Sequence, residues 1–225
     1  MNNVLIRIAD AFAPYGDAIR AALLQTGIDD SSGDGSHDWS HLVRVWKLVK
    51  QISAHETAVD LEMLAIATLL HDCVPVEKSD PRRALASQLS ADKARDVLKA
   101  IGWDTARIEA TAHVIEAHSF SANIAPRSLE ARILRDADRL DAIGAIGIAR
   151  TFYVAGRMGS RLYDFDDPLA RERRPDDTTF ALDHFDVKLL KLADGMSTEG
   201  AQRIAQKRVA IMRQFVQDLA DEITA

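Results

Sequence analysis

The sequence predicts an all-α protein, a single-domain helical bundle, and three observations support that fold class. Apolar residues recur at spacings of three and four along most of the chain, strand-like alternation is almost absent, and capping residues stand near the ends of the periodic stretches. A chain of 225 residues with 47% hydrophobic content suits one large domain or two small ones, and we expect one. Its core should cover about residues 36–150, and a C-terminal loop and helices at 151–225 should complete the fold.

The predicted helices follow one another with short breaks. In order, the periodic stretches cover residues 4–24, 42–52, 61–70, 84–101, 108–117, 129–152, 185–192 and 204–223. Asp60 and Asp104 can cap the helices that follow them, and Pro81 suits a first helical position. Glycines that can terminate helices stand at positions 27, 102 and 195.

Two irregular stretches interrupt this pattern. Residues 29–36 are polar and contain glycine, and they lie directly before His37, so the first chemical motif opens a helix that emerges from a loop. Residues 163–182 are rich in Asp and Arg. At about twenty residues this second stretch exceeds the usual loop length, which favours a lid or a substrate loop.

Composition excludes several classes of protein. The net charge of -6 and a pI near 5.6 argue against dedicated nucleic-acid binding but allow small polyanionic ligands. Cys73 is the only cysteine, so no intrachain disulfide can form. The N-terminus lacks a basic region followed by an apolar core, and no apolar run approaches the length of about 18 residues needed to span a membrane. We therefore expect a soluble cytoplasmic protein without membrane association, of open oligomeric state.

His71 and Asp72 stand side by side at the end of the apolar run 65–70. An isolated charge in an apolar setting is costly unless it is paired or ligated, and a divalent metal accepts a neutral imidazole and an ionised carboxylate together. Because two residues cannot hold a metal, further ligands must come from elsewhere. His41 and Asp138 are the best candidates.

The histidines near the start of the second predicted helix are weaker evidence on their own. His37 and His41 are four apart and so share a face if both are helical. Because Ser36 or Asp38 can serve as the N-cap, we favour His41 as a ligand. His37 would then support the ligands without binding the metal itself. A role for His41 as a hydrogen-bonded core histidine stays open.

Three aspartates lie close together in the predicted helix 129–152. Asp138 and Asp141 are three apart and share a face, whereas Asp136 points elsewhere. Since the helix continues with few polar residues, at least one aspartate should face inward and need a proton, a hydrogen bond or a metal. Asp141 can instead pair with Arg139 or Arg135.

Taken in order, these motifs resemble the HD superfamily of metal-dependent phosphohydrolases. The matching segments are His41-Leu42-Val43-Arg44-Val45, His71-Asp72, and Asp138 within Ala137-Asp138-Arg139-Leu140. The resemblance is strongest to the stand-alone bacterial YedJ/YpgQ-like branch, because it also covers residues 117–121, 124–126, 136–140, 144–147 and 181–185. It therefore extends over about residues 36–192 and implies one HD-type domain.

The resemblance implies that His41, His71, Asp72 and Asp138 ligate one divalent cation, with Asp136 as the fallback for Asp138. We expect Mn(II) first because mixed nitrogen and oxygen ligation suits it, with Fe(II), Co(II), Ni(II) and Mg(II) behind. A six-coordinate ion would keep about two positions open for water and a substrate oxygen. Hydroxide formed on the metal could then attack phosphorus, with Asp72 counted among the catalytic residues.

Cations and histidines elsewhere could bind phosphate. Lys78 matches the resembling branch and is the first choice, with Arg82 second, although cations at a helix start can simply be solvated. His118, at a helix end, could bind phosphate or protonate a leaving group, while His113 is nearly as well explained as a core residue. His184 and Lys188, four apart after the long loop, could reach a triphosphate or form an exposed basic face.

The predicted function is hydrolysis of a small phosphorylated substrate, a nucleotide. The leading hypothesis is a nucleoside or deoxynucleoside triphosphate pyrophosphohydrolase. A phosphomonoesterase or cyclic-nucleotide phosphodiesterase could use the same metal site. A nucleotide-sensing module that binds without turnover is an alternative of another class, although a pure binder has no need for open metal positions.

Overall fold

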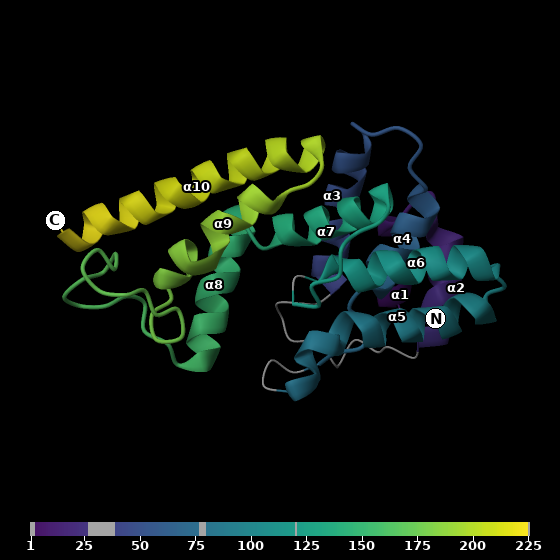
Figure 1. Ribbon diagram of the computed structural model, residues 1–225, viewed down its shortest axis with the longest axis horizontal. Helices are drawn as coiled ribbons and strands as arrows, with labels where there is room; N and C mark the ends of the chain where they lie inside the picture. Colours follow the sequence, from purple (N-terminus) through teal and green to yellow (C-terminus); the bar gives the residue numbers. More distant parts are fainter. Residues whose placement is uncertain (1–2, 27–38, 77–79, 120, 225) are drawn as a thin grey trace. The chain divides into compact units, whose positions relative to one another are not determined.

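The computed structural model describes residues 3–26, 39–76, 80–119 and 121–224, and all its regular elements are helical (Figure 1). The α-helices are α1 (Asn3–Ala11), α2 (Gly16–Thr26), α3 (Trp39–Ser53), α4 (Leu61–Leu70), α5 (Ala86–Ala100), α6 (Thr105–His118), α7 (Leu129–Asp141), α8 (Gly144–Met158), α9 (Leu190–Leu192) and α10 (Glu199–Thr224). Shorter elements are the 3-10 helices η1 (Pro81–Leu85) and η3 (Ala193–Gly195) and the π-helix η2 (Phe185–Leu189). The predicted all-α class is confirmed.

The chain forms two compact units, Met1–Asp138 and Arg139–Ala225, so that the division falls within α7. Each unit has its own buried apolar residues. The expected single domain over residues 1–225 stays a prediction. None of the helices in the described ranges is both long enough and apolar enough to cross a membrane.

In the first unit, α4 is the most deeply buried helix and packs against α2, α3, α5 and α6. Every residue from Leu64 to Leu70 is buried. The Asp60 side chain caps α4 by accepting a hydrogen bond from the Met63 N–H at 2.9 Å, as the sequence predicted. Asp104 caps α6 in the same way. The Asp60 cap sets the start of α4. The ten-residue length of the helix then sets the position of His71, which directly follows it.

The N-terminal prediction of one periodic stretch over residues 4–24 was too coarse. The chain instead forms α1 and α2, separated near Pro14, which lacks the N–H that a continuous helix requires. Phe12, at the break, stacks on Trp46 of α3 with ring centroids 5.3 Å apart. The sequence prediction merged the two helices because apolar residues keep a helical spacing from one helix into the next.

The predicted stretch 129–152 is also divided, into α7 and α8. The chain turns at Gly144, whose φ of +80° is a left-handed conformation that favours glycine. A Cβ atom at this position would lie 2.9 Å from Cγ of Arg208, so a larger residue would also clash. The apolar pattern continues across this turn and gave no sign of it.

In the second unit, α8 packs against α10, and three aromatic rings fill the space near η2. Phe215 of α10 lies 5.8 Å from both Phe152 and Phe185, measured between ring centroids. The only β-type pairing among the described residues is one parallel bridge between Arg161 and Phe180, which closes the base of the long irregular segment.

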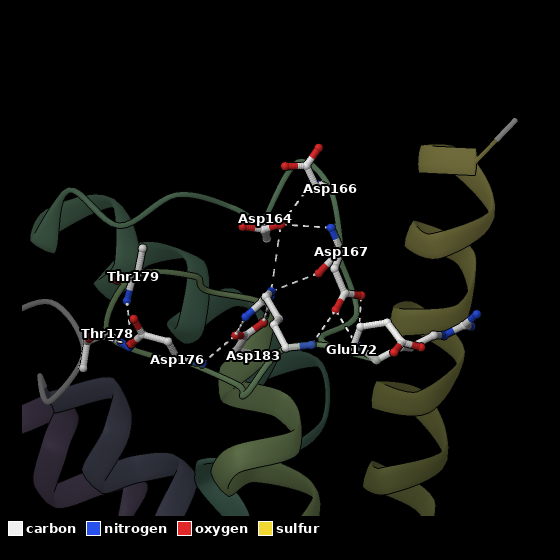
Figure 2. A network of polar contacts seen from close by, with 10 residues as sticks. Asp164, Asp166, Asp167, Glu172, Asp176, Thr178, Thr179 and Asp183 are labelled. Atoms are coloured by element: carbon white, nitrogen blue, oxygen red, sulfur yellow. Dashed lines mark hydrogen bonds and ion pairs between the residues drawn. The ribbon is translucent and has the colours of Figure 1, made fainter.

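That segment is ordered by its own polar contacts, which Figure 2 shows from close by. Asp167 accepts hydrogen bonds from three consecutive backbone N–H groups, those of residues 171, 172 and 173. Arg173 makes a two-pronged ion pair with Asp183, at 2.5 and 2.8 Å, and its guanidinium lies over the Phe180 ring. Asp183 also accepts from the Asp176 N–H at 2.7 Å. Arg173 is thus a structural residue of this segment.

We predict that Arg173→Ala destabilises the protein by about 2–3 kcal/mol, because the Asp183 carboxylate, 1% exposed, would lose its cation. Urea unfolding followed by circular dichroism measures the change. Arg174→Ala is the matched control, since Arg174 is exposed and has no ion pair among the described residues. Equal stability of the two variants would contradict the structural role of Arg173.

Candidate metal centre

Five polar side chains converge at the ends of buried helices of the first unit. His41 lies in α3, His71 and Asp72 directly follow α4, His118 ends α6, and Asp138 lies in α7. The three histidines are almost fully buried, with exposed fractions of 1%, 0% and 5% for His41, His71 and His118. The two carboxylates are more open, at 39% for Asp72 and 30% for Asp138. The cluster therefore has a buried imidazole side and an accessible carboxylate side.

The distances within the cluster suit ligands of one ion. Nε2 of His41 lies 3.3 Å from Nε2 of His71 and 3.5 Å from Oδ1 of Asp138. Nε2 of His71 lies 3.6 Å from Oδ2 of Asp72 and 3.9 Å from Oδ1 of Asp138. Ligand atoms at right angles around a small divalent ion stand about 3 Å apart. Among the described residues, His41, His71 and Asp138 form one group of possible ligands, and His71, Asp72 and His118 form a second group, so His71 is common to both.

Backbone carbonyls fix how two of the imidazole rings are turned. Nδ1 of His71 donates to the Thr68 carbonyl at 2.8 Å, and Nδ1 of His118 donates to the Ile115 carbonyl at 2.6 Å. In a neutral ring the proton then resides on Nδ1, and Nε2 carries the lone pair that a metal needs. The donor set therefore fits a divalent cation.

Protonation also favours ligation. Burial lowers the pKa of His71 despite the opposing charge of Asp72, so this ring is neutral at pH 7. Burial alone would raise the pKa of Asp72, but His71 and His118 lower it well below its usual value. Asp72 is consequently an ionised carboxylate beside a neutral imidazole, which is the pair that a divalent metal accepts.

His118 has the opposite shift. Its burial favours the neutral ring, yet its hydrogen bond to Asp72 and the Asp72 charge raise its pKa above the ordinary value. Nε2 of His118 lies 3.6 Å from Oδ1 of Asp72. His118 was predicted to touch phosphate or a leaving group, and its pairing with Asp72 is a contact that sequence spacing did not reveal.

The aspartates of α7 differ in placement. Asp138 approaches the histidines, whereas Asp136 is fully buried and is absent from the groups of described residues that could hold a metal. Asp141 is buried in the second unit and pairs with Arg150 at 3.3 Å. An ion pair of Asp141 was one of the two alternatives, with Arg139 or Arg135 as the predicted partner, and Arg150 was not foreseen.

The other predicted residues lie elsewhere or outside the described ranges. His113 accepts a hydrogen bond from the Arg127 N–H at 3.0 Å. Arg82 is exposed and pairs with Asp80 at 2.8 Å. In the second unit, His184 pairs with Asp177, and Lys188 is exposed. Lys78 and His37 fall outside the residues that the structure describes, so their roles, like the substrate roles of the others, stay predictions.

Sequence reasoning missed Ser90 of α5. Its hydroxyl accepts a hydrogen bond from the Val74 N–H at 3.2 Å, and its carbonyl accepts from the Cys73 thiol at 3.6 Å. These contacts fix the turn that follows Asp72. Nothing in the sequence pointed to them, because a buried serine on an amphipathic helix has no distinguishing pattern.

We predict that His71→Ala weakens Mn(II) binding by at least about tenfold, since one ligand and its orienting contact are lost. Isothermal titration calorimetry of the metal-free protein measures this affinity. His55→Ala is the control, because His55 is exposed and lies outside the cluster. A His71→Ala variant that binds Mn(II) as tightly as the wild type would refute the proposed ligand set.

The raised pKa of His118 predicts a pH dependence of stability in the metal-free protein. A folded-state pKa above the unfolded value stabilises the fold below the ordinary histidine pKa, and this stabilisation disappears as pH rises through the folded-state pKa. The stability advantage of the wild type over His118→Gln should therefore be larger at pH 5.5 than at pH 9. Urea titrations across this range provide the measurement, and a difference that grows with pH would contradict the Asp72 contact.

Comparisons with known proteins identify the family of this chain. The model of the HD domain family matches residues 38–143. The YpgQ protein of Bacillus subtilis is 38% identical over 199 residues, which cover 87% of each chain. Among solved structures, an HD-superfamily hydrolase from Bacillus thuringiensis has a TM-score of 0.70 at 32% identity and covers 92% of this chain and 96% of its own.

A crystal structure of B. subtilis YpgQ in complex with ADP has a TM-score of 0.69 at 33% identity, with 92% of this chain and 97% of that chain covered. The matched region contains every residue of the cluster, from His41 to Asp138. Both the sequence relative and the hydrolase neighbour extend well beyond that region. The chain therefore belongs to the HD superfamily and has the fold of its hydrolases.

Proposed function

We propose that the chain is a divalent-metal-dependent phosphohydrolase that converts nucleoside or deoxynucleoside triphosphates into nucleoside monophosphate and pyrophosphate. The observation that carries the proposal is the gathering of possible ligands around His71, with His41 and Asp138 in one group and Asp72 in an overlapping one, and with both carboxylates partly exposed. The ADP complex of the YpgQ relative supports a nucleotide as ligand. Mn(II) is the proposed ion, because the mixed nitrogen and oxygen donors suit it.

The four residues would hold the ion from its buried side. A divalent ion bound there supplies Lewis-acid chemistry, since it activates water as a nucleophile and neutralises charge on phosphate oxygens. The carbonyls of Thr68 and Ile115 keep the rings of His71 and His118 turned toward the cluster. Preset orientation reduces the rearrangement that the reaction requires.

In the proposed reaction, water adds to the α-phosphorus and the bond from the α-phosphorus to the α–β bridging oxygen breaks. The leaving pyrophosphate gains negative charge and benefits from a proton. His118 can hold a proton on Nε2, because Asp72 raises its pKa, and the ring is close to the accessible side of the cluster. We propose His118 as the residue that gives this proton, with Lys78 and Arg82 as phosphate contacts.

The proposal predicts that the wild type with Mn(II) releases pyrophosphate and nucleoside monophosphate in equal amounts from a triphosphate. A screen of nucleoside mono-, di- and triphosphates and cyclic nucleotides, with phosphate and pyrophosphate quantified separately, measures this. Phosphate release from monophosphates would favour a phosphomonoesterase, and opening of cyclic nucleotides would favour a phosphodiesterase. Binding without turnover of any nucleotide would favour the sensing module.

Asp72→Ala should lower turnover by at least about a hundredfold. The ion would lose a ligand, and protonated His118 would lose the carboxylate that stabilises its charge. Far-ultraviolet circular dichroism should remain that of a helical protein. His55→Ala, which changes an exposed histidine, should keep the wild-type rate. Unchanged turnover in purified Asp72→Ala would count decisively against the mechanism.

A further inference from the structure

The turn after Asp72 lies against α5, and Ser90 is the residue of α5 that contacts it. As described above, both the hydroxyl and the carbonyl of Ser90 bind the backbone or side chain of residues 73 and 74. Ser90 is itself only 1% exposed. The face of α5 that includes Ser90 is therefore next to the metal-binding cluster.

Lys93 lies one turn farther along this face. Residues three apart on a helix are neighbours, with Cβ atoms about 5–6 Å apart. Lys93 is partly buried, and its ammonium group makes no ion pair or hydrogen bond with any residue in the described ranges. Arg95 on the same helix is committed to Asp92, Glu109 and Glu116.

The contacts of Ser90 place this turn of α5 beside residues 73 and 74, which directly follow Asp72. Lys93 comes one helical turn after Ser90. A lysine ammonium group sits at the end of a flexible four-carbon stem, so the Lys93 side chain can extend from this turn toward a ligand held at Asp72.

A phosphate ligand needs such a cation. Two neutral imidazoles and two carboxylates balance the charge of a divalent ion, so the cluster with its ion brings little net positive charge to a polyphosphate. Arg82, which we propose as a phosphate contact, shares its charge with Asp80, so a further cation would strengthen phosphate binding. Among the described cations, Lys93 combines closeness to the turn after Asp72 with an unpaired ammonium group.

We propose that Lys93 is a substrate-binding residue of this site and contacts the phosphate groups beyond the α-phosphate. The inference rests on the proposed function, because it assumes that a nucleoside polyphosphate binds at the cluster. Lysine binds phosphate as a point charge and needs no fixed hydrogen-bond geometry. Lys93→Arg should therefore retain most of the affinity, whereas Lys93→Gln should not.

The test compares Lys93→Gln with Lys99→Gln, which removes an exposed lysine from the same helix about 9 Å farther along its axis. Isothermal titration of ADP in the presence of Mn(II) should show an affinity about tenfold lower for Lys93→Gln, and an unchanged affinity for Lys99→Gln. The loss for AMP should be smaller. Mn(II) alone should bind both variants like the wild type, which would show that the cluster is intact.

Steady-state kinetics add a second readout. KM for the triphosphate should rise about tenfold in Lys93→Gln while kcat changes less, because the lost contact acts on bound phosphate. Wild-type ADP affinity in Lys93→Gln would overturn the role of Lys93 alone. ADP binding without any triphosphate turnover by the wild type would instead overturn the proposed function. A wild type that neither binds ADP nor turns over any triphosphate would overturn both.

Discussion

The site depends on one constraint: histidine nitrogen atoms and carboxylate oxygen atoms, all with lone pairs, lie close together. Nε2 of His41 and Nε2 of His71 are 3.3 Å apart, and carboxylate oxygens of Asp72 and Asp138 lie within 4 Å of His71. Lone pairs repel one another at such distances unless a cation or a proton lies between them. The buried helices supply the packing energy that holds these atoms together.

Helix α4 connects that packing to the chemistry. It is buried on all sides from Leu64 to Leu70, and the residue that follows is the first member of the His-Asp pair. A helix that touches four others has little freedom to shift along its axis or rotate. The position of His71 is thus determined by hydrophobic contacts, while its ring orientation is determined by one carbonyl.

Sequence reasoning identified the all-α class, the capping aspartates and the residues that meet in the cluster, because each had a local pattern or an unusual pairing of polar and apolar residues. It failed where the decisive contact is distant in sequence. At Gly144 a left-handed backbone and the close approach of Arg208 exclude a side chain, and the turn after Asp72 is held by Ser90. His113 shows the same limit, since its partner Arg127 lies fourteen residues away.

The segment between Arg161 and Asp183 shows that a coil can be as organised as a helix. Asp167 gathers three backbone N–H groups, hydrogen bonds hold the pKa of Asp176 at about 2, and Arg173 joins the segment to Asp183 (Figure 2). Ion pairs and hydrogen bonds hold this segment together, whereas apolar contacts hold the helix cores. The stability of the segment is therefore more sensitive to ionic strength. Concentrated salt would therefore loosen this segment before it loosens the helix cores.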